Sequence, residues 1–201
     1  MKIHDNNPME HFQEWFYETK NNHPEDEVNA MHLTTIGIDA YPKSRVVLLK
    51  SYNWEGFTFF TNYKSEKGLA ITINPKVQLL FNWKKSGKIV KIEGHVRKIN
   101  SNVSEQYFHS RPRGSQLGAW VSRQSQKIPN RDFLTEQLDL LEQKYQGKEI
   151  PMPQYWGGYI VEPTRFEFFN RAFANIENKV IYQLSKDYNW NIKKELELNY
   201  N

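Results

Sequence analysis

The sequence of 201 residues contains no cysteine, which excludes a disulfide framework, a thiolate metal site and a nucleophilic thiol. Any redox chemistry must therefore come from a bound cofactor. Long apolar runs are missing as well, and the first residues, MKIHDNN, lack the apolar core of a signal peptide. We therefore expect a cytoplasmic protein with no membrane segment.

Concentrated charge of one sign is also absent. The formal net charge is +4 and the pI is about 9.0, which favours anionic partners. The longest basic runs, however, are pairs such as Lys84-Lys85 and Lys193-Lys194. Because a nucleic-acid surface needs clustered cations, we expect no nucleic-acid partner and interpret the scattered lysines as a solvated surface.

Several catalytic signatures are missing too. Neither G-x-G-x-x-G nor G-x-x-x-x-G-K-[ST] is present, which argues against a dinucleotide fold and a P-loop. The six histidines show no metal-ligand spacing, so no metal site is expected. Ser125 lies between Gln124 and Gln126 rather than in a nucleophile elbow, so a serine hydrolase has little support.

What the sequence does contain is the composition of a folded protein. It is 38% hydrophobic and 14% aromatic, and its length predicts a single domain over residues 1–201. Apolar residues recur near helical spacing in residues 8–22, which predicts an N-terminal helix. We expect further helices at about 65–73 and 131–145, and two short ones in 102–121 that are broken at 111–114.

Most other segments are rich in β-branched or aromatic residues and are separated by turn sequences, which is typical of strands. The predicted strands are 30–38, 44–52, 57–61, 77–83, 88–99, 155–161, 165–170, 179–184 and 190–196. This order favours a mainly β fold with flanking helices (α+β), built as a closed or split antiparallel barrel.

Cations and hydroxyls gather in two places that suit anions. Arg45 and Lys50 lie on one predicted strand at an odd spacing, so we expect them on opposite faces, where they could serve two anions. Hydroxyls and two more lysines follow in residues 61–67. A second cluster in residues 107–116 combines a phenol, two arginines and two hydroxyls around a helix break. Both clusters indicate a protein that binds phosphorylated small molecules.

These clusters lie in stretches that resemble the pyridoxamine 5′-phosphate oxidases, which are FMN enzymes of the split-barrel fold. The similar stretches are NAM (29–31), RVVLLK (45–50), FFTNYKSEK (59–67), YFHSRP (107–112), SQLGAWVSRQS (115–125) and PQYWGGY (153–159). SRP, GAWVS and WGG in this order are specific to the family. The resemblance runs from about residue 29 to the C-terminus.

The resemblance implies two groups of site residues in a homodimer with FMN at the interface, and Gln124 and Ser125 would reach FMN from the partner subunit. The FMN-binding positions it implies are Arg45, Val46, Val47, Leu48, Lys50, Phe60, Thr61, Ser65, Glu66, Lys67, Gln124, Ser125, Phe169 and Lys179. The positions it implies for the phosphorylated substrate are Lys50, Tyr107, Arg111, Ser115, Asn175 and Glu177.

The implied reaction oxidises pyridoxamine 5′-phosphate or pyridoxine 5′-phosphate, both vitamin B6 phosphates, to pyridoxal 5′-phosphate. Oxygen would be the acceptor and hydrogen peroxide the second product. The flavin would supply the electron chemistry, and the protein would contribute positioning and electrostatics. No residue is singled out as a catalytic acid or base.

The chain departs from the family pattern around its C-terminal motif. Asn175 replaces an arginine and Glu177 a histidine that face the substrate ring, while Lys179 replaces an arginine that helps to hold FMN. Elsewhere the substituted positions are Phe60 for tyrosine, Glu66 for arginine, Ile89 for glutamine and Phe169 for tryptophan. Removing a planar donor fork and adding an acceptor-only group alters the expected substrate side of the pocket.

Two alternatives to the leading hypothesis stay open at this point. One is a related flavin oxidoreductase that acts on another small phosphorylated or heteroaromatic substrate. The other is a flavin or B6-phosphate binding protein without turnover. Asn175 and Glu177 are the sequence features on which these interpretations differ.

Overall fold

The computed structural model describes residues 7–122, 130–171 and 176–198, with residues 171, 176, 177, 197 and 198 described as backbone only. Its helices are α1 Pro8–Asn22, α2 Glu66–Ile73, α3 Ser101–Ser110, α4 Arg113–Val121 and α5 Arg131–Lys144. Its strands are β1 Ala30–Ile36, β2 Pro42–Leu48, β3 Ser51–Asn53, β4 Gly56–Asn62, β5 Lys76–Trp83, β6 Lys88–Lys98, β7 Trp156–Arg171, β8 Ile176–Leu184 and β9 Trp190–Leu198.

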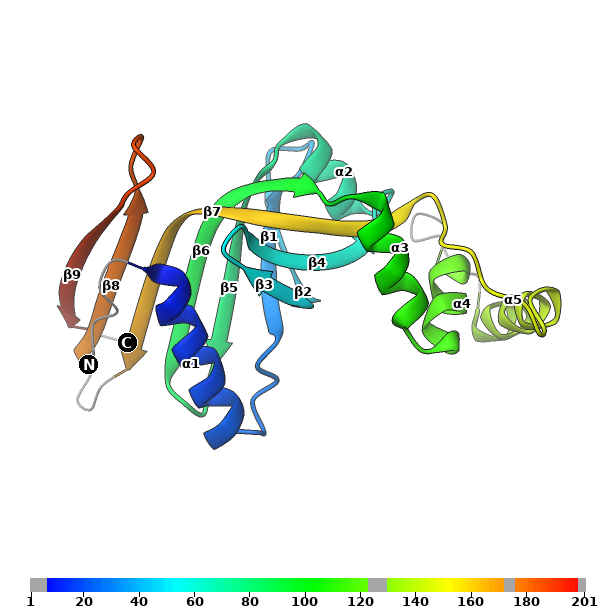
Figure 1. Ribbon diagram of the computed structural model, residues 1–201, viewed down its shortest axis with the longest axis horizontal. Helices are drawn as coiled ribbons and strands as arrows, with labels where there is room; N and C mark the ends of the chain where they lie inside the picture. The colour runs from blue at the N-terminus through cyan, green and yellow to red at the C-terminus, as the bar shows by residue number, and fades with distance from the viewer. Residues whose placement is uncertain (1–6, 123–129, 172–175, 199–201) are drawn as a thin grey trace.

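The described strands form one curled antiparallel sheet with flanking helices (Figure 1). Its order is β2-β1-β5-β6-β7-β4-β3, and β8 and β9 extend it from the second half of β7. The curl brings the β2 end back toward β4, because the Lys50 N–H donates to the Thr58 carbonyl at 2.9 Å. This half-barrel confirms the predicted mainly β fold of the split-barrel type.

The prediction of a single strand over residues 44–52 is wrong. β2 ends at Leu48, and the chain then changes partner, since the Leu49 N–H donates to Asn29 of the β1 side and the Lys50 N–H to Thr58 of β4. Leu49 is buried at this crossing. Arg45 and Lys50 therefore do not share a strand, and the expected arrangement on opposite faces of one strand does not apply.

The break predicted between residues 161 and 165 is also wrong, because β7 continues through Pro163. A proline has no N–H to donate, yet it is tolerated at a bulge. The pairing of β6 with β7 shifts register between Glu93 and Gly94, opposite this proline. A Cβ on Gly94 would lie 2.3 Å from the Glu162 carbonyl oxygen, so the close approach of the two strands requires glycine there.

α1 packs across the sheet and closes one side of the main core. The Asn7 side chain caps the helix by accepting the Met9 N–H at 3.0 Å, and Pro8 occupies the first turn. Phe12 is fully buried against the rings of Phe57 and Phe81. The N-terminal helix thus gains its stability from the aromatic face that its spacing predicts.

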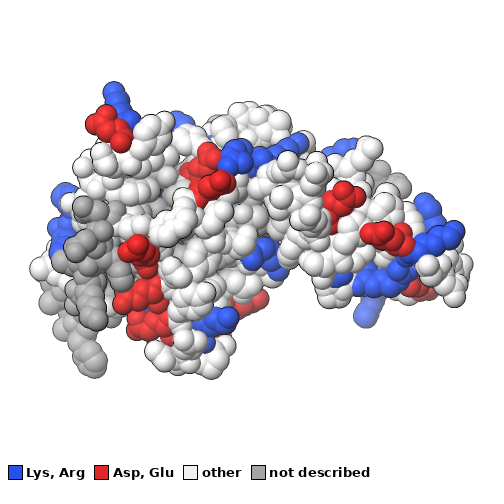
Figure 2. Space-filling model, viewed as in Figure 1, with Lys and Arg blue, Asp and Glu red and all other residues white. Residues whose placement is uncertain are grey.

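A second, smaller apolar cluster lies beyond the end of the barrel, where α3, α4 and α5 pack around the start of β7 (Figure 1). Phe108, Leu117 and Trp156 are buried in it. On the face drawn in Figure 2, basic and acidic side chains are mixed. Within the described ranges, no helix is long and apolar enough to cross a bilayer.

Candidate functional site

The first predicted cluster forms where β4 ends and α2 begins. Ser65 caps α2: its Oγ accepts the Gly68 N–H at 3.4 Å and donates to the Asn62 carbonyl at 2.7 Å. The Lys67 ammonium donates to Thr61 Oγ1 at 3.3 Å and to Ser65 Oγ at 3.4 Å. Thr61 and Ser65 are buried, so this ammonium is held over two fixed hydroxyls at a helix N-terminus.

Arg45 joins this cluster from β2. Its Nη1 donates to Thr35 Oγ1 at 2.8 Å and to the Lys43 carbonyl at 2.7 Å, which fixes the guanidinium beside the sheet. Burial, followed by the charge of Arg45, lowers the pKa of Lys67 below its ordinary value. We call Arg45, Thr61, Ser65 and Lys67 the α2 cation cluster. Arg45 and Lys67 repel each other, and a bound anion would offset this repulsion.

The negative charge of Glu66, next to this cluster, is paired with cations. Its carboxylate accepts a hydrogen bond from Lys43 at 2.8 Å and lies 3.7 Å from the Arg45 guanidinium. The hydrogen bond from Lys43 is the main reason that the pKa of Glu66 is lowered. Sequence reasoning missed Lys43, although residues 43 and 45 of one strand share a face, and this alternation was the available signal.

The second predicted cluster is organised by an aromatic stack of Phe60, Tyr107 and Trp156. The Phe60 ring lies 3.9 Å from that of Tyr107 at 20° and 5.3 Å from that of Trp156 at 14°. The Arg111 guanidinium lies over Trp156 at 4.8 Å and over Phe108 at 5.7 Å. Arg111 follows the last residue of α3, so the helix end points the cation at the start of β7.

Arg111 carries a buried hydrogen-bond donor. Its Nη1 is buried, and among the described residues it has no hydrogen-bond partner. Burial also lowers the pKa of this guanidinium, which nevertheless stays charged. A buried donor without a partner is costly, so its presence points to a ligand that would accept from it.

Two further predicted substrate residues, Lys50 and Ser115, form no hydrogen bond with Arg111 among the described residues. Lys50 and Ser115 are exposed, and the contacts described for them are backbone hydrogen bonds, from Lys50 to Thr58 and from Ser115 to Pro112. Their predicted roles stay predictions. Lys50 lies between β2 and β3, and Ser115 lies in the first turn of α4, so both side chains are open to a ligand or a second chain.

β4 carries both clusters because neighbouring residues of a strand point to opposite faces. Phe60 faces the aromatic stack, and Thr61 faces Lys67. The predicted use of opposite sides of one strand is therefore found on β4, not on the strand that holds Arg45. Residues of the two clusters therefore lie on opposite faces of β4.

Two residues predicted to bind FMN, Phe169 and Lys179, lie in the C-terminal part of the sheet, on β7 and β8. The Lys179 ammonium is 5.3 Å from the Phe169 ring and forms ion pairs with Glu167 and Glu195. On β7, Phe60 pairs with Gly158, and Phe169 lies about 35 Å further along the strand at a rise of roughly 3.3 Å per residue. Phe169 and its pairing partner Lys179 therefore lie at the opposite end of β7 from Gly158, the residue that pairs with Phe60.

The remaining predicted positions are placed as follows. Val46 and Leu48 are exposed and Val47 is half-buried on β2, while Ile89 on β6 pairs with Phe169. The backbone of Glu177 pairs with that of Arg171 in β8 and β7. Gln124, Ser125 and Asn175 lie outside the described residues.

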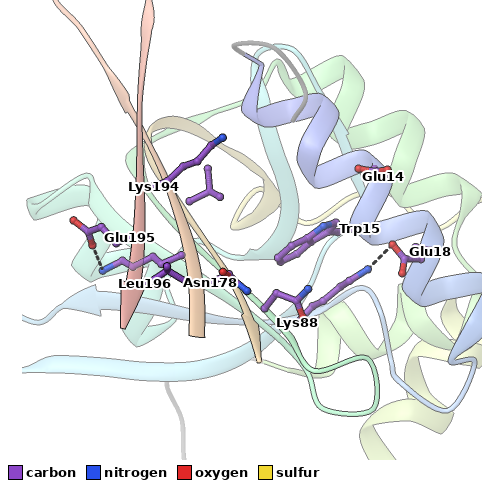
Figure 3. A pocket seen from close by; sticks show the side chains of 11 residues that line it. Glu14, Trp15, Glu18, Lys88, Asn178, Lys194, Glu195 and Leu196 are labelled. Atoms are coloured by element: carbon purple, nitrogen blue, oxygen red, sulfur yellow. Dashed lines mark ion pairs between the residues drawn. The ribbon is translucent and has the colours of Figure 1, made fainter. Parts of the chain in front are cut away.

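A groove of about 720 Å³ lies between α1 and strands β8 and β9 (Figure 3). Lys88 in its wall is buried, forms an ion pair with Glu18 at 2.5 Å and lies 5.2 Å from the Trp15 ring. Among the described residues, Lys179 is the one predicted site residue in its lining. Within its lining, Lys88 pairs with Glu18 and Lys179 pairs with Glu195.

A curled antiparallel half-barrel with helices at its end and a cation cluster at a helix N-terminus defines the class of FMN-binding split barrels. Comparison with solved structures agrees on the fold. The chain superposes on PhzG from Burkholderia lata 383, solved with tetrahydrophenazine-1-carboxylic acid, with a TM-score of 0.89 at 21% identity, covering 96% of this chain and 94% of that one. A pyridoxamine 5′-phosphate oxidase-related, FMN binding protein from Nostoc punctiforme gives 0.75 at 11% identity, covering 97% and 99%.

Sequence comparison identifies the family. The family model described as pyridoxamine 5′-phosphate oxidase matches residues 21–145. A pyridoxine/pyridoxamine 5′-phosphate oxidase of Flavobacterium johnsoniae is 46% identical over 93% of this chain and 87% of its own length. That of Flavobacterium psychrophilum is 47% identical over the same shares. The chain belongs to the pyridoxamine 5′-phosphate oxidase family, a family of FMN-dependent oxidases, which confirms the predicted family, enzyme class and cofactor.

The α2 cation cluster fits the phosphate end of FMN. Two cations, two buried hydroxyls and the N-terminus of α2 converge there, and a phosphate dianion would relieve the repulsion between Arg45 and Lys67. Within the described residues, no group of histidine, aspartate or glutamate side chains is arranged to hold a metal ion.

Proposed function

We propose that this protein oxidises pyridoxamine 5′-phosphate or pyridoxine 5′-phosphate to pyridoxal 5′-phosphate, with oxygen as the acceptor. Family membership and the names of relatives that are almost half identical support this reaction. The observation that carries the proposal is that the two cation-bearing clusters meet opposite faces of β4, because the reaction needs one phosphate site for FMN and another for the substrate.

In this proposal the α2 cation cluster binds the FMN phosphate. Lys67 donates from above the two hydroxyls of Thr61 and Ser65, and Arg45 supplies the second charge. Lys43 pairs with both Glu66 at 2.8 Å and Asp39 at 2.9 Å, and these two carboxylates face three cations, Lys43, Arg45 and Lys67, so the region stays net positive despite the acidic residue at position 66. The predicted contacts of Val46, Val47 and Leu48 on β2 belong to the same site.

The substrate phosphate is bound at the other face of β4. Arg111 offers the buried Nη1 donor, and Tyr107 is held beside it by its stack on Phe60. Lys50, between β2 and β3, and Ser115, in the first turn of α4, are exposed and complete the predicted phosphate site. Because the rings exclude water around the guanidinium, each hydrogen bond to the phosphate is stronger than it would be in solvent.

Bound FMN would supply the electron chemistry by taking a hydride from the substrate carbon that bears the alcohol or amine and passing two electrons to oxygen, with hydrogen peroxide as the product. The alcohol substrate then yields the aldehyde directly, whereas the amine also consumes water and releases ammonia. This chain contributes positioning, because two separately anchored phosphates fix the distance between the reacting groups.

We also propose that the site is shared between two copies of the chain. Phe169 lies about 35 Å along β7 from the residue that pairs with Phe60, and Lys179 pairs with Phe169 from β8, so we place both against the FMN on β4 of a partner subunit. Gln124 and Ser125 are expected to act in the same way. The single FMN-binding domain over residues 1–201 and the cytoplasmic location stay predictions.

The test is to load the purified protein with FMN and add pyridoxine 5′-phosphate or pyridoxamine 5′-phosphate under air. Formation of the aldehyde with one peroxide per turnover is expected. A flavin-loaded protein that oxidises neither compound would contradict the proposal. It would favour a different phosphorylated or heteroaromatic substrate, or binding without turnover.

A further inference from the structure

We propose that Trp156 is the positioning residue of Arg111: its ring holds the guanidinium in place for the substrate phosphate without using any of the guanidinium's hydrogen-bond donors. This inference rests on the proposed function, and it assigns a task to a residue outside the predicted set. It concerns how the substrate site is built and not which residues touch the phosphate.

Trp156 is itself rigidly fixed. It is the first residue of β7, where it pairs with Asn62 of β4 and donates its N–H to the Pro153 carbonyl at 2.9 Å. Its ring is stacked by Phe60 and met edge-on by Phe108 at 5.2 Å and 70°. With 7% of its surface exposed, Trp156 has little freedom to change rotamer.

The way in which Arg111 is held matters for what it can bind. Its guanidinium carbon lies 4.8 Å from the Trp156 centroid, well inside the range of a cation–π contact. A carboxylate partner would have occupied the N–H donors, whereas a ring contacts the face of the guanidinium and leaves the N–H groups free in its plane. The buried Nη1, with no partner among the described residues, is such a free donor.

A comparison within the chain supports this reading. Arg113, two residues on, is held by hydrogen bonds from its own nitrogens, to Glu142 at 2.7 Å and to the Tyr145 carbonyl at 2.8 Å. The N–H donors of Arg113 are therefore occupied by acceptors of the protein itself. Arg111 and Arg113 lie at the same helix break, but ring support leaves one of them available for a ligand.

The test is a double-mutant cycle on the flavin-loaded protein. The probe is 4-deoxypyridoxine 5′-phosphate, whose methyl group can neither be oxidised nor form an imine with lysine, and its dissociation constant is measured by equilibrium dialysis. Trp156→Leu is expected to weaken binding roughly tenfold when Arg111 is present. In an Arg111→Ala background the same change should alter the dissociation constant by less than about twofold.

Two comparisons separate positioning from a structural role. Trp156→Phe keeps a ring and is expected to weaken binding only about threefold, again only when Arg111 is present, so the cycle stands even if the leucine variant does not fold. Unphosphorylated 4-deoxypyridoxine should bind equally to all folded variants, because it lacks the group that Arg111 recognises. FMN content and the thermal midpoint report folding.

The outcomes are distinct. Additive effects of Trp156→Leu or Trp156→Phe with Arg111→Ala, or equal weakening of both probes, would overturn the positioning role alone. Wild-type protein that does not prefer the phosphate ester over the unphosphorylated probe would overturn the proposed substrate class, and with it this inference, before any variant is compared.

Discussion

Gly158→Ala tests whether the aromatic stack depends on the absence of a side chain beneath it. Gly158 lies on β7 opposite Phe60. A Cβ at this position would lie 2.4 Å from Cδ1 and 2.8 Å from Cγ1 of Ile99, and 2.8 Å from Cε1 of Phe60. Because carbon atoms pack at about 3.5 Å or more, both side chains must retreat by roughly 0.7 to 1 Å.

The magnitude follows from these contacts. Overpacking of a buried site costs about 1–3 kcal/mol, and tilting Phe60 away from Tyr107 forfeits part of a stacking energy of about 0.5–1.5 kcal/mol. We therefore expect the free energy of unfolding to fall by about 2 kcal/mol, which for a chain of this size lowers the thermal midpoint by roughly 4–8 °C. The KM for the phosphorylated substrate should rise about fivefold, since Tyr107 loses its support.

The assay is thermal and urea unfolding of the FMN-loaded protein, together with steady-state oxidation. Gly114→Ala is the matched control, because a Cβ there meets nothing within 4 Å and the residue lies exposed on α4. It should leave KM unchanged and stabilise the protein by about 0.5–1 kcal/mol. Adding Ile99→Val, which removes the nearest methyl group, should restore part of the loss. If Gly158→Ala is as stable as Gly114→Ala with an unchanged KM, the close packing beneath Phe60 is not what holds the stack.

Three further outcomes are expected. The pKa of Lys67 is lowered from 10.5, so its ammonium loses its proton at a lower pH than an ordinary lysine, and the dissociation constant of FMN should start to rise before the pH reaches 10.5. Lys67→Arg should move this rise to higher pH. An unchanged pH profile would assign the rise to another group. Glu66→Gln removes a negative charge beside the cluster and should tighten FMN binding severalfold in a fluorescence titration, while Glu55→Gln, an equally exposed ion-paired residue, should not; weaker binding would mean that Glu66 orients Arg45. Tyr182→Phe removes the 3.1 Å hydrogen bond to His11 and should lower the free energy of unfolding by about 1 kcal/mol in urea titrations, and no change would show that the bond is replaced by water.

Much of the fold could be predicted because local patterns coincide with tertiary packing. The α1 range, the Ser65 cap and the helix break at Arg111-Pro112 follow from side-chain spacing and from capping or proline chemistry. The errors occur where the chain changes partners. The sequence around Leu49 predicts the middle of a strand. In the structure, however, the N–H groups of Leu49 and Lys50 donate to different neighbouring segments, and no local sequence pattern predicts such a change of partner.

The candidate site could likewise be predicted only in part. An anion site was predicted here from the types of residue, and the structure brings the side chains of Arg45, Thr61, Ser65 and Lys67 together, while their binding of an anion stays a prediction. Lys43 was missed because its importance comes from pairing with Glu66 across two elements. Trp156 was missed as a support for Arg111, since a tryptophan at the start of a buried strand is usually core.

The length of β7 has a genetic consequence for an assembly of two chains. If each reaction centre draws its Lys67 from one copy and its Lys179 from the other, two alleles that are each inactive would complement one another. A mixed pair would contain one centre with both lesions and one with neither, so random mixing should recover about a quarter of the normal rate. Alleles with lesions at Lys67 and Arg45, both drawn from the same copy, should not complement at all.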